Sequence, residues 1–502
     1  MLTDIEQKIS LLPLIVLIFG AIGFVVCIFL TPLVIKHLGP LIRARRELHQ
    51  THQQPVPRLG GIALAAAFVF VTLATFALTP PLPGHPRIVL GLSSLAMFGL
   101  GLWDDFSPLG ARKKLLGQIL IALLACWCGL KIDTFKNPLN GVVYALGGWS
   151  VFATVFWLVA MTNLINLIDG IDGLAAGISL MLMCLLVYVG LHGQMFSLGI
   201  ATGMAGALVA FLIFNFPPAK IYLGDGGAYF LGYLIGGLTI ENSNKGTVAA
   251  ALIAPVFALA LPILDTSFSI VRRGLKGLPI FRPDRRHIHH RLMQRGWSRR
   301  RTVLTLYAVS LVFLALAFAA FWSGGRMTPI LVGCGFLVVL VITPSFGLIR
   351  NWLAVGHVLG NSLEMRKEIQ YALLMRKWME TEAERCQSLA ALWEDFTSVA
   401  RRLGFTQVTL THGEARCAWS SGAAHPDLHC HRHELHIQGE TVVLELCAPK
   451  TMDGNRFLTL NELAAEIWQH SAQRWLKRTA GTFMLPAGSS EAAPAISYSG
   501  VS

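Results

Sequence analysis

The sequence predicts a polytopic α-helical membrane protein with a small cytoplasmic α+β domain at its C-terminus. Of the 502 residues, 54% are hydrophobic and only 14% are charged, and the mean hydropathy is +0.58. Soluble domains carry roughly 25% charged residues, so this composition excludes an ordinary soluble enzyme. Apolar stretches that approach or exceed the roughly 18–20 residues needed to cross a bilayer recur along the first 350 residues.

These apolar stretches predict about eleven membrane-spanning helices, of which the third and the eighth are short. The first stretch lacks a basic leading segment and a small-residue cleavage site, so we expect it to be retained as a helix and not removed as a signal peptide. The expected spans are residues 11–38, 60–79, 88–103, 115–131, 150–167, 173–191, 195–214, 226–240, 248–271, 302–322 and 327–349.

Lysine and arginine are concentrated in the loops after the first, third and ninth spans. Short loops rich in these residues stay in the cytoplasm, so the N-terminus is expected to face outward and the C-terminus to face the cytoplasm. The net charge of +13 follows from this bias and from a basic active face, with anchoring to anionic lipid headgroups as the alternative for part of it. Nucleic-acid binding is therefore not predicted. The basic residues of these loops are Arg43, Arg45, Arg46, Arg58, Arg112, Lys113, Lys114 and those between 272 and 301.

Beyond residue 350 the composition becomes that of a soluble domain. Residues 364–405 combine dense charge with apolar residues at helical spacing, and 458–478 have the pattern of a closing amphipathic helix. Between them, "TQVTLTH", "HELHIQ" and "TVVLELCA" have strand patterns. The last residues are rich in Pro, Ser, Gly and Ala, which predicts disorder. The predicted regions are a membrane-embedded domain at 1–350, an α+β accessory domain at 351–480 and a disordered tail at 481–502.

Acidic, amide and histidine side chains gather at helix ends and in one loop that the predicted topology places on the cytoplasmic face. Ionisable groups at a membrane boundary are costly and usually mark function. Carboxylates brought together repel one another unless a cation compensates, and hard oxygen ligands suit Mg²⁺ or Mn²⁺ better than zinc. These residues are Asp104 and Asp105; Asn163, Asn166, Asp169 and Asp172; Asp225; and Asp284, His287, His289 and His290.

The basic loop after the ninth span complements these acids. In "FRPDRRHIHHRL" (281–292), arginine side chains can bind phosphate oxygens in a bidentate manner. A divalent cation beside such a loop indicates phosphoryl transfer at the membrane surface, where positioning and charge neutralisation do most of the catalysis.

Each cluster taken alone also has a structural explanation. An Asp-Asp pair at a helix end can be solvated, a Gly-Asp-Gly-Gly stretch can be only a turn, and histidines in a basic loop can be surface residues. Asp265, late in the ninth span, fits equally a buried hydrogen-bonded residue or a member of the acidic cluster. An ion-coupled transporter is the alternative from another class, but it predicts acidic residues near the bilayer midplane. The convergence of separate clusters on one face favours an enzyme.

Four of these stretches, in this order, resemble the polyprenyl-phosphate N-acetylhexosamine-1-phosphate transferases. The resemblance covers about residues 11–350 and does not extend to the C-terminal domain. The earlier segment "RRELHQTHQQPVPRLGGIA" at 45–63 is also similar to the first cytoplasmic segment of that family. The four stretches are Asp104-Asp105 with "KKLLGQ", then "NLINLIDGIDGLAAG", "YLGDGG" and "FRPDRRHIHHRLMQRG".

The resemblance implies transfer of a sugar 1-phosphate from a UDP-N-acetylhexosamine to a polyprenyl phosphate, with release of UMP. It implies that Asp225 binds Mg²⁺, with Asp105 as a further metal candidate, and that Asp104 and Asp105 lie beside the lipid phosphate. Asp104 is the better candidate for deprotonating that phosphate. The other residues implied are Asn163, Asn166, Asp169 and Asp172 in the nucleotide and metal pocket, Lys114 at a phosphate, and Arg282, Arg285, Arg286, His287, His289 and His290 at the donor diphosphate.

The histidine loop is similar to the WecA/TagO-type branch of the family, which implies UDP-N-acetylglucosamine as the donor. A sibling enzyme that uses another UDP-N-acetylhexosamine stays open. The resemblance also implies a multi-pass protein of the bacterial inner membrane and suggests a homodimer. One departure is Ala228, which stands where the family usually has serine.

Two further patterns concern cysteine and histidine. The nine cysteines form no CxxC pair, so neither a disulfide framework nor a zinc site is predicted. His429, His431 and His433 alternate in "HPDLHCHRHELH" and would share one face of a strand. An exposed polar strand is favoured there over a metal site.

Overall fold

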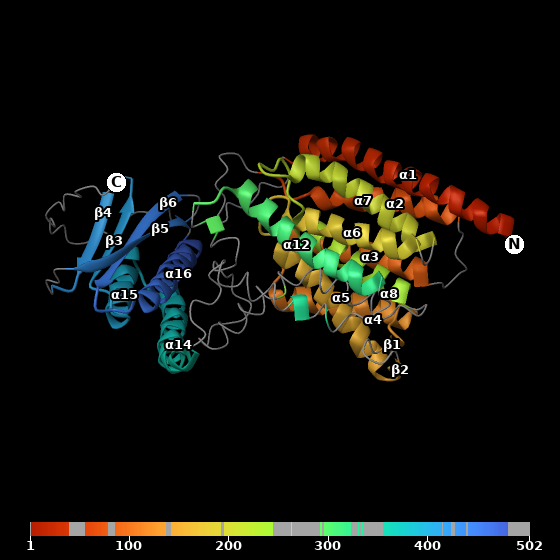
Figure 1. Ribbon diagram of the computed structural model, residues 1–502. Helices are drawn as coiled ribbons and strands as arrows, with labels where there is room; N and C mark the ends of the chain where they lie inside the picture. Colours follow the sequence, from red (N-terminus) through yellow and green to blue (C-terminus); the bar gives the residue numbers. More distant parts are fainter. Residues whose placement is uncertain are drawn as a thin grey trace. The chain divides into compact units, whose positions relative to one another are not determined.

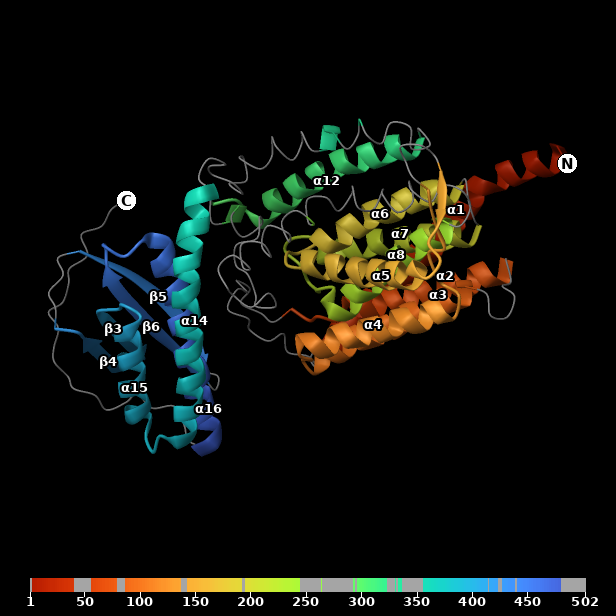
Figure 2. The same cartoon turned by 90° about the horizontal axis from the view of Figure 1, so that it is seen from below.

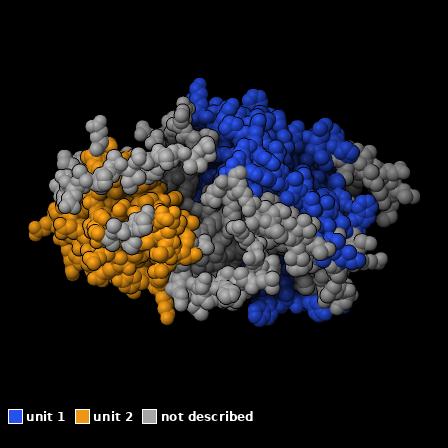
Figure 3. All heavy atoms as spheres, turned by 60° about the vertical axis from the view of Figure 1, so that its left-hand side comes forward, with its two compact units in different colours: residues 1–46, 50–269, 283–350 blue, residues 47–49, 270–282, 351–502 orange. Residues whose placement is uncertain are grey.

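The structure is a computed structural model in which the chain divides into two compact units (Figure 1, Figure 3). Unit 1 comprises residues 1–46, 50–269 and 283–350, and unit 2 comprises 47–49, 270–282 and 351–502. The structure describes residues 2–39, 56–78, 86–136, 142–191, 195–243, 263, 292–293, 296–322, 330, 333–335, 355–413, 415–422, 427–437 and 440–479.

Unit 1 is a bundle of apolar helices. Six of its described helices are long and apolar enough to cross a membrane, which makes the protein a multi-pass membrane protein. The predicted spans from 11–38 to 226–240, and that at 302–322, each coincide with a described helix, whereas those at 248–271 and 327–349 lie almost entirely outside the described residues. The total of eleven stays a prediction. The helices are α1 (Leu2–Leu33) with the π-helical η1 (Val34–Leu38), α2 (Gly60–Leu78), α3 (Pro86–Phe106), α4 (Ala111–Trp127), α5 (Trp149–Ile168), α6 (Leu174–Leu191), α7 (Met195–Asn215), α8 (Gly224–Ser243) and α12 (Arg299–Trp322).

Helix α8 is the central element of unit 1. It contacts α2, α3, α5, α6 and α7, and almost all of its residues are buried. Small residues permit this, because a Cβ on Gly101 of α3 would lie 2.4 Å from the Asp225 carbonyl oxygen and one on Gly61 of α2 would lie 2.4 Å from the Gly227 nitrogen. Close backbone approach at glycine is the usual way in which membrane helices pack tightly. The start of α8 is therefore fixed against two neighbours.

Between α4 and α5 the chain forms a short antiparallel hairpin that the sequence analysis did not predict. Its strands are β1 (Thr134–Lys136) and β2 (Val143–Ala145), with Phe135 opposite Tyr144. Strands of three residues are too short to show an alternating pattern, so periodicity could not reveal them.

Unit 2 has the predicted α+β composition. Its four strands form one antiparallel sheet in the order β4-β3-β6-β5 (Figure 2). Its helices carry the aromatic core residues Trp393, Phe396 and Trp468. The Ser388 hydroxyl caps α15 by accepting a hydrogen bond from the Ala391 N–H. The elements are α14 (Val355–Arg385), α15 (Leu389–Arg402), β3 (Gln407–His412), β4 (Ala415–Ser420), β5 (Leu428–Ile437), β6 (Glu440–Pro449) and α16 (Gly454–Thr479).

One disulfide joins Cys430 of β5 to Cys447 of β6, a pair that the sequence analysis did not predict. The two residues are direct partners in the antiparallel register, with their Cα atoms 4.1 Å apart. The register between β5 and β6 brings these two cysteines together. The spacing of cysteines in the sequence does not reveal strand register, so the pair could not be predicted from it.

The alternating histidines of β5 do share one side of the strand. The rings of His431 and His433 lie 4.8 Å apart, the ring of His429 lies 5.7 Å from that of Phe457, and His433 contacts Asn461. Within the residues that the structure describes, no third metal-ligating side chain completes a group with them. The observed contacts are those of a polar strand beside α16.

Candidate active site

The N-terminus of α8 is capped by a carboxylate from another helix. Asp105, at the end of α3, accepts hydrogen bonds from the backbone N–H groups of Asp225 and Gly226, each at 2.9 Å. The first N–H groups of a helix lack intrahelical partners and carry partial positive charge, so an anion is favoured there. Gly224, which precedes Asp225, has a φ of +76°, a conformation that glycine adopts without strain. Asp105 thereby positions Asp225.

Asp225 is the meeting point of three other helices. Its Oδ1 accepts a hydrogen bond from Asn166 Nδ2 of α5 at 2.9 Å, and its Oδ2 lies 3.2 Å from Lys114 Nζ of α4. The same ammonium group also forms an ion pair with Asp104 Oδ2 of α3. Asp104, Asp225, Lys114 and Asn166 therefore form one polar network, assembled from residues more than 100 positions apart in the chain.

The carboxylates of this network differ in accessibility. The side chain of Asp104 is only 3% exposed, and its Oδ1 accepts the Leu109 N–H at 2.6 Å. The side chain of Asp225 is 32% exposed. Both carboxylates have partners from the protein, but Asp225 is the one of the two that solvent, a metal ion or a phosphate can reach.

Asp169 lies at the C-terminal cap of α5, close to the same carboxylates. Burial raises the pKa of its carboxyl group well above the usual range, and the negative charges of Asp225 and Asp105 raise it further. The positive charge of Arg58 opposes this rise. Arg58 was not among the predicted site residues, although it lies in the first basic loop and in the segment at 45–63 that resembles the family.

The structure ties Asp172 and Asn163 to other partners. Asp172 is buried, and its Oδ2 accepts the Ala219 N–H at 3.1 Å and lies 3.5 Å from Arg299 Nη1. Asn163 Nδ2 donates to Gln118 Oε1 at 2.7 Å. Gln118 was not predicted as a site residue, although it ends the "KKLLGQ" stretch. Its Nε2 atom is buried without a hydrogen-bond partner in the described part of the chain, so it is an unsatisfied donor beside the network.

The predicted basic loop cannot be compared with this network. Its residues lie outside the described ranges, so their roles stay predictions. They are Arg282, Asp284, Arg285, Arg286, His287, His289 and His290, and the same holds for Asp265.

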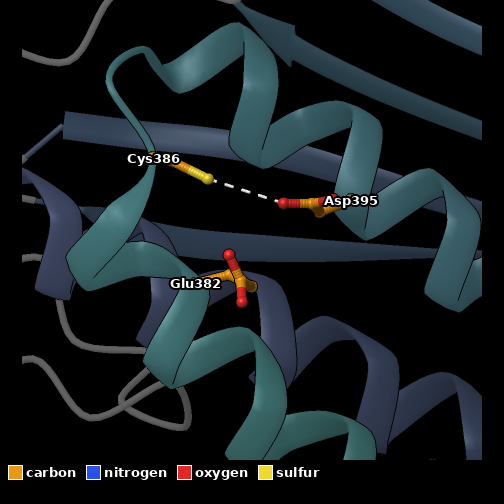
Figure 4. Close-up of side chains that lie close together, drawn as sticks. All are labelled: Glu382, Cys386 and Asp395. Atoms are coloured by element: carbon orange, nitrogen blue, oxygen red, sulfur yellow. Dashed lines mark hydrogen bonds between the residues drawn. The ribbon is translucent and has the colours of Figure 1, made fainter.

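The donor chemistry around Asp225 fits a magnesium ion. Carboxylate and amide oxygens are hard ligands, and Mg²⁺ is commonly bound through one or two carboxylates while water and substrate phosphates complete its shell. In the described residues, three candidate ligand atoms lie within 4.8 Å of one another at Glu382, Cys386 and Asp395 in unit 2 (Figure 4). Among the same residues, the carboxylates around Asp225 do not form such a group. An ion at Asp225 would thus depend on substrate oxygens for much of its coordination.

The fold and the site define a multi-pass membrane enzyme whose acidic centre, bridged by a lysine, lies at one end of the helix bundle. Comparison with known proteins identifies its family. The pattern of Glycosyl transferase family 4 matches residues 87–243, which include Asp104, Asp105, Lys114, Asp169 and Asp225.

Several relatives are similar over most of their own length. A Bacillus subtilis (strain 168) protein named "Probable undecaprenyl-phosphate N-acetylglucosaminyl 1-phosphate transferase" is 35% identical over 66% of this chain and 92% of its own. A Mycolicibacterium smegmatis "Decaprenyl-phosphate N-acetylglucosaminephosphotransferase" is 34% identical over 58% of this chain and 78% of its own. A Desulforudis audaxviator "Phospho-N-acetylmuramoyl-pentapeptide-transferase" is 33% identical over 61% of this chain and 97% of its own.

This chain belongs to glycosyl transferase family 4, among the polyprenyl-phosphate N-acetylhexosamine-1-phosphate transferases that the sequence motifs resemble. It is a phosphosugar transferase, and the transporter alternative is set aside.

Proposed function

We propose that the protein transfers N-acetylglucosamine 1-phosphate from UDP-N-acetylglucosamine to undecaprenyl phosphate or a related polyprenyl phosphate, releasing UMP. The product is the first intermediate of a lipid-linked glycan. The names of the Bacillus subtilis and Mycolicibacterium smegmatis relatives support the sugar and the polyprenyl acceptor. The observation that carries the proposal is the network in which Lys114 joins Asp104 to the more exposed Asp225.

This network suits phosphoryl transfer because that reaction depends on positioning and on neutralising charge. Asp225, oriented by Asn166 and by the Asp105 cap, would hold Mg²⁺, and Asp169 would lie close to the ion. When bound, Mg²⁺ would neutralise the donor diphosphate and favour departure of UMP. Lys114 bridges two carboxylates and would draw an incoming phosphate toward them.

The lipid phosphate would attack the phosphorus that bears the sugar. A new phosphorus–oxygen bond forms, the bond between the two donor phosphates breaks, and UMP leaves with its electron pair. A phosphate monoester has a second pKa near 6, so at neutral pH this nucleophile is mostly dianionic. Asp104 would therefore accept a proton from only a minor fraction of acceptor molecules, and charge neutralisation is the larger contribution. Trapping a nucleotide-free sugar-phosphate on the enzyme without lipid would contradict direct attack.

The topology belongs to the same proposal. The positive-inside pattern supports a bacterial inner-membrane protein with its site, its basic loops and its accessory domain at 351–480 in the cytoplasm. We also propose a homodimer as the assembly, which chemical cross-linking in membranes would test.

Radiolabelled donors test the function directly. Membranes containing the protein, Mg²⁺ and undecaprenyl phosphate are incubated with labelled UDP-N-acetylglucosamine, and the lipid product is extracted. We expect label in the lipid phase and stoichiometric UMP, both lost when Mg²⁺ is chelated and restored by Mg²⁺ or Mn²⁺. Parallel reactions with UDP-N-acetylgalactosamine and other UDP-N-acetylhexosamines decide the sugar. Preferential transfer of another sugar would contradict the donor assignment, and absence of transfer from every donor would contradict the function.

A further inference from the structure

Helix α8 is joined to α3 by polar contacts near both of its ends. At the end that carries the candidate active site, Asp105 of α3 caps the first turn of α8. Near the opposite end, Arg87 Nε of α3 donates to Glu241 Oε1 of α8 at 3.2 Å. The two helices are thus antiparallel and tied at both edges of the bundle.

The Arg87–Glu241 pair is largely removed from solvent. The side chain of Glu241 is 5% exposed and that of Arg87 is 18% exposed. The Arg87 guanidinium also lies 5.4 Å from the ring centre of Phe196 on α7. A buried ion pair is costly to break, because removing one partner leaves an uncompensated charge in an apolar environment. If Arg87 lost its charge, the negative charge of Glu241, the more buried partner, would be left uncompensated.

The spacing along the two helices connects this pair to the candidate active site. Eighteen positions separate Arg87 from Asp105, and sixteen separate Asp225 from Glu241, which correspond to about 27 Å of α3 and about 24 Å of α8. These lengths approach the roughly 30 Å of a bilayer core. The ion pair and the Asp105 cap therefore lie near opposite boundaries of the membrane on the same two helices.

Between the Asp105 cap and the Arg87–Glu241 ion pair, α3 and α8 pack so tightly that a displacement of α8 at one contact is transmitted to the other. A Cβ on Gly101 would lie 2.4 Å from the Asp225 carbonyl oxygen, and one on Gly237 would lie 2.1 Å from Leu90 Cδ1. Close-packed interfaces of this kind have little room to deform and pass strain along. If Glu241 moved toward water to hydrate a stranded charge, α8 would shift along its axis and carry Asp225 with it.

We propose that Arg87 and Glu241 are positioning residues, which set the axial register of α8 against α3 and so place Asp225 relative to Asp104 and Lys114. Neither side chain touches the network that it positions. The kinetic part of the test rests on the proposed transferase function, whereas hydrogen exchange at the start of α8 does not depend on it.

The test compares Arg87→Gln, Glu241→Gln and the double variant with the full-length wild-type protein in nanodiscs. Transferase kcat and KM are measured for UDP-N-acetylglucosamine, and hydrogen exchange is measured by mass spectrometry for the peptide that contains the Asp225 and Gly226 amides. Lys131→Gln is the matched control, because Lys131 pairs with Asp133 at 3.5 Å in a more exposed setting outside the α3–α8 interface.

We expect Arg87→Gln to lower kcat about tenfold while KM changes less than about threefold, since small displacements of catalytic groups cost rate. The Asp225 and Gly226 amides should exchange faster. Glu241→Gln should have a smaller effect, and the double variant should regain part of the lost kcat because no stranded carboxylate remains. Lys131→Gln should match the wild type in both readouts.

Unchanged kcat and exchange in Arg87→Gln would overturn the proposal, as would a uniform rise in exchange along all of α8 with no recovery in the double variant. If Arg87→Gln does not accumulate in membranes, the double variant decides, with faster exchange at Asp225 and Gly226 supporting the proposal and wild-type exchange opposing it. A wild-type protein without transferase activity would refute the proposed function, and exchange alone would then decide the positioning role.

Discussion

Each unit of the protein contains a cluster of acidic side chains, and the two clusters are built differently. In unit 1, Asp104 and Asp225 share the Lys114 ammonium group, and Asn166 fixes the second oxygen of Asp225. In unit 2, Glu382 and Asp395 lie around the Cys386 thiol, which donates a weak hydrogen bond to Asp395 at 3.5 Å. The first cluster joins four helices, whereas the second lies within two successive helices and their connection.

The ion pairs of the two units also differ in how far their side chains are exposed to solvent. The ion pairs of the unit 1 cluster involve side chains that are 3–32% exposed. Pairs in unit 2 such as Lys450–Asp427 are 52% and 70% exposed. Buried charges without partners are costly, whereas exposed pairs contribute about 0–1 kcal/mol. Substitutions in the first cluster should therefore have large effects, and those in unit 2 should have small ones.

The largest effect is expected for Asp225→Asn. The change removes the charge of the accessible carboxylate while keeping its shape and the acceptor for Asn166. Transferase activity should fall at least ~10²-fold, because charge neutralisation is the main catalytic contribution in phosphoryl transfer. Initial rates across a Mg²⁺ titration, with the amount of folded protein measured by size-exclusion chromatography in detergent, check this. Turnover near that of the wild type would refute the metal role of Asp225.

Lys114→Gln should rank next. It leaves Asp104 and Asp225 without their shared cation, so we expect a loss of activity of ~10²-fold and a fall of about 3 kcal/mol in the free energy of unfolding of unit 1. The matched control is Lys450→Gln in unit 2, whose exposed pair should contribute less than about 1 kcal/mol. Activity and thermal unfolding of both variants check the contrast. Similar effects of the two substitutions would remove the distinction between the ion pairs of the two units.

The sequence was informative where a signal extends along one element. Apolar length identified the described helices of unit 1, with both ends of α7 within one residue, because the bilayer sets a minimum span. The expectation that the third and eighth spans are short was wrong, since α3 has 21 residues and α8 has 20. The carboxylates at the helix ends were identified because charges there stand out against an apolar background. Asp104, Asp105, Asp169 and Asp225 were named in this way, and the structure brings them to one end of the bundle.

What could not be predicted depends on register between distant elements. Asp105 caps a helix that begins 119 positions later, and nothing in its local sequence distinguishes capping from metal binding. The Arg87–Glu241 pair, the Gln118–Asn163 contact and the Cys430–Cys447 disulfide have the same origin. Each requires knowledge of which residues lie opposite one another across an interface, and composition or periodicity carries no such information.

A smaller effect is expected for Asp395→Asn, which should change the reactivity of the neighbouring Cys386 thiol. Burial, the largest cause, together with the hydrogen bond to Asp395 and the charge of that residue, raises the pKa of this thiol from 9.0 to about 11. At pH 8 the thiol therefore holds less of the reactive thiolate than an ordinary cysteine. Asp395→Asn should lower this pKa and speed alkylation of Cys386 several-fold, as followed by peptide mass spectrometry. Equal or slower alkylation in the variant would show that Asp395 does not control the thiol.

The smallest effect on catalysis is expected when unit 2 is shortened. Removal of residues 355–502 deletes the described elements of unit 2 and leaves the Asp104–Lys114–Asp225 network intact. If unit 1 contains the complete catalytic machinery, transferase activity in membranes should stay within about threefold of the wild type, because the rate depends on groups that position and neutralise the phosphates. Lipid-linked product is measured per amount of protein in the membrane. Complete loss of activity in a truncated protein that still elutes as a folded species would mean that unit 2 contributes to the catalytic centre, and the separation between the two regions would then fail.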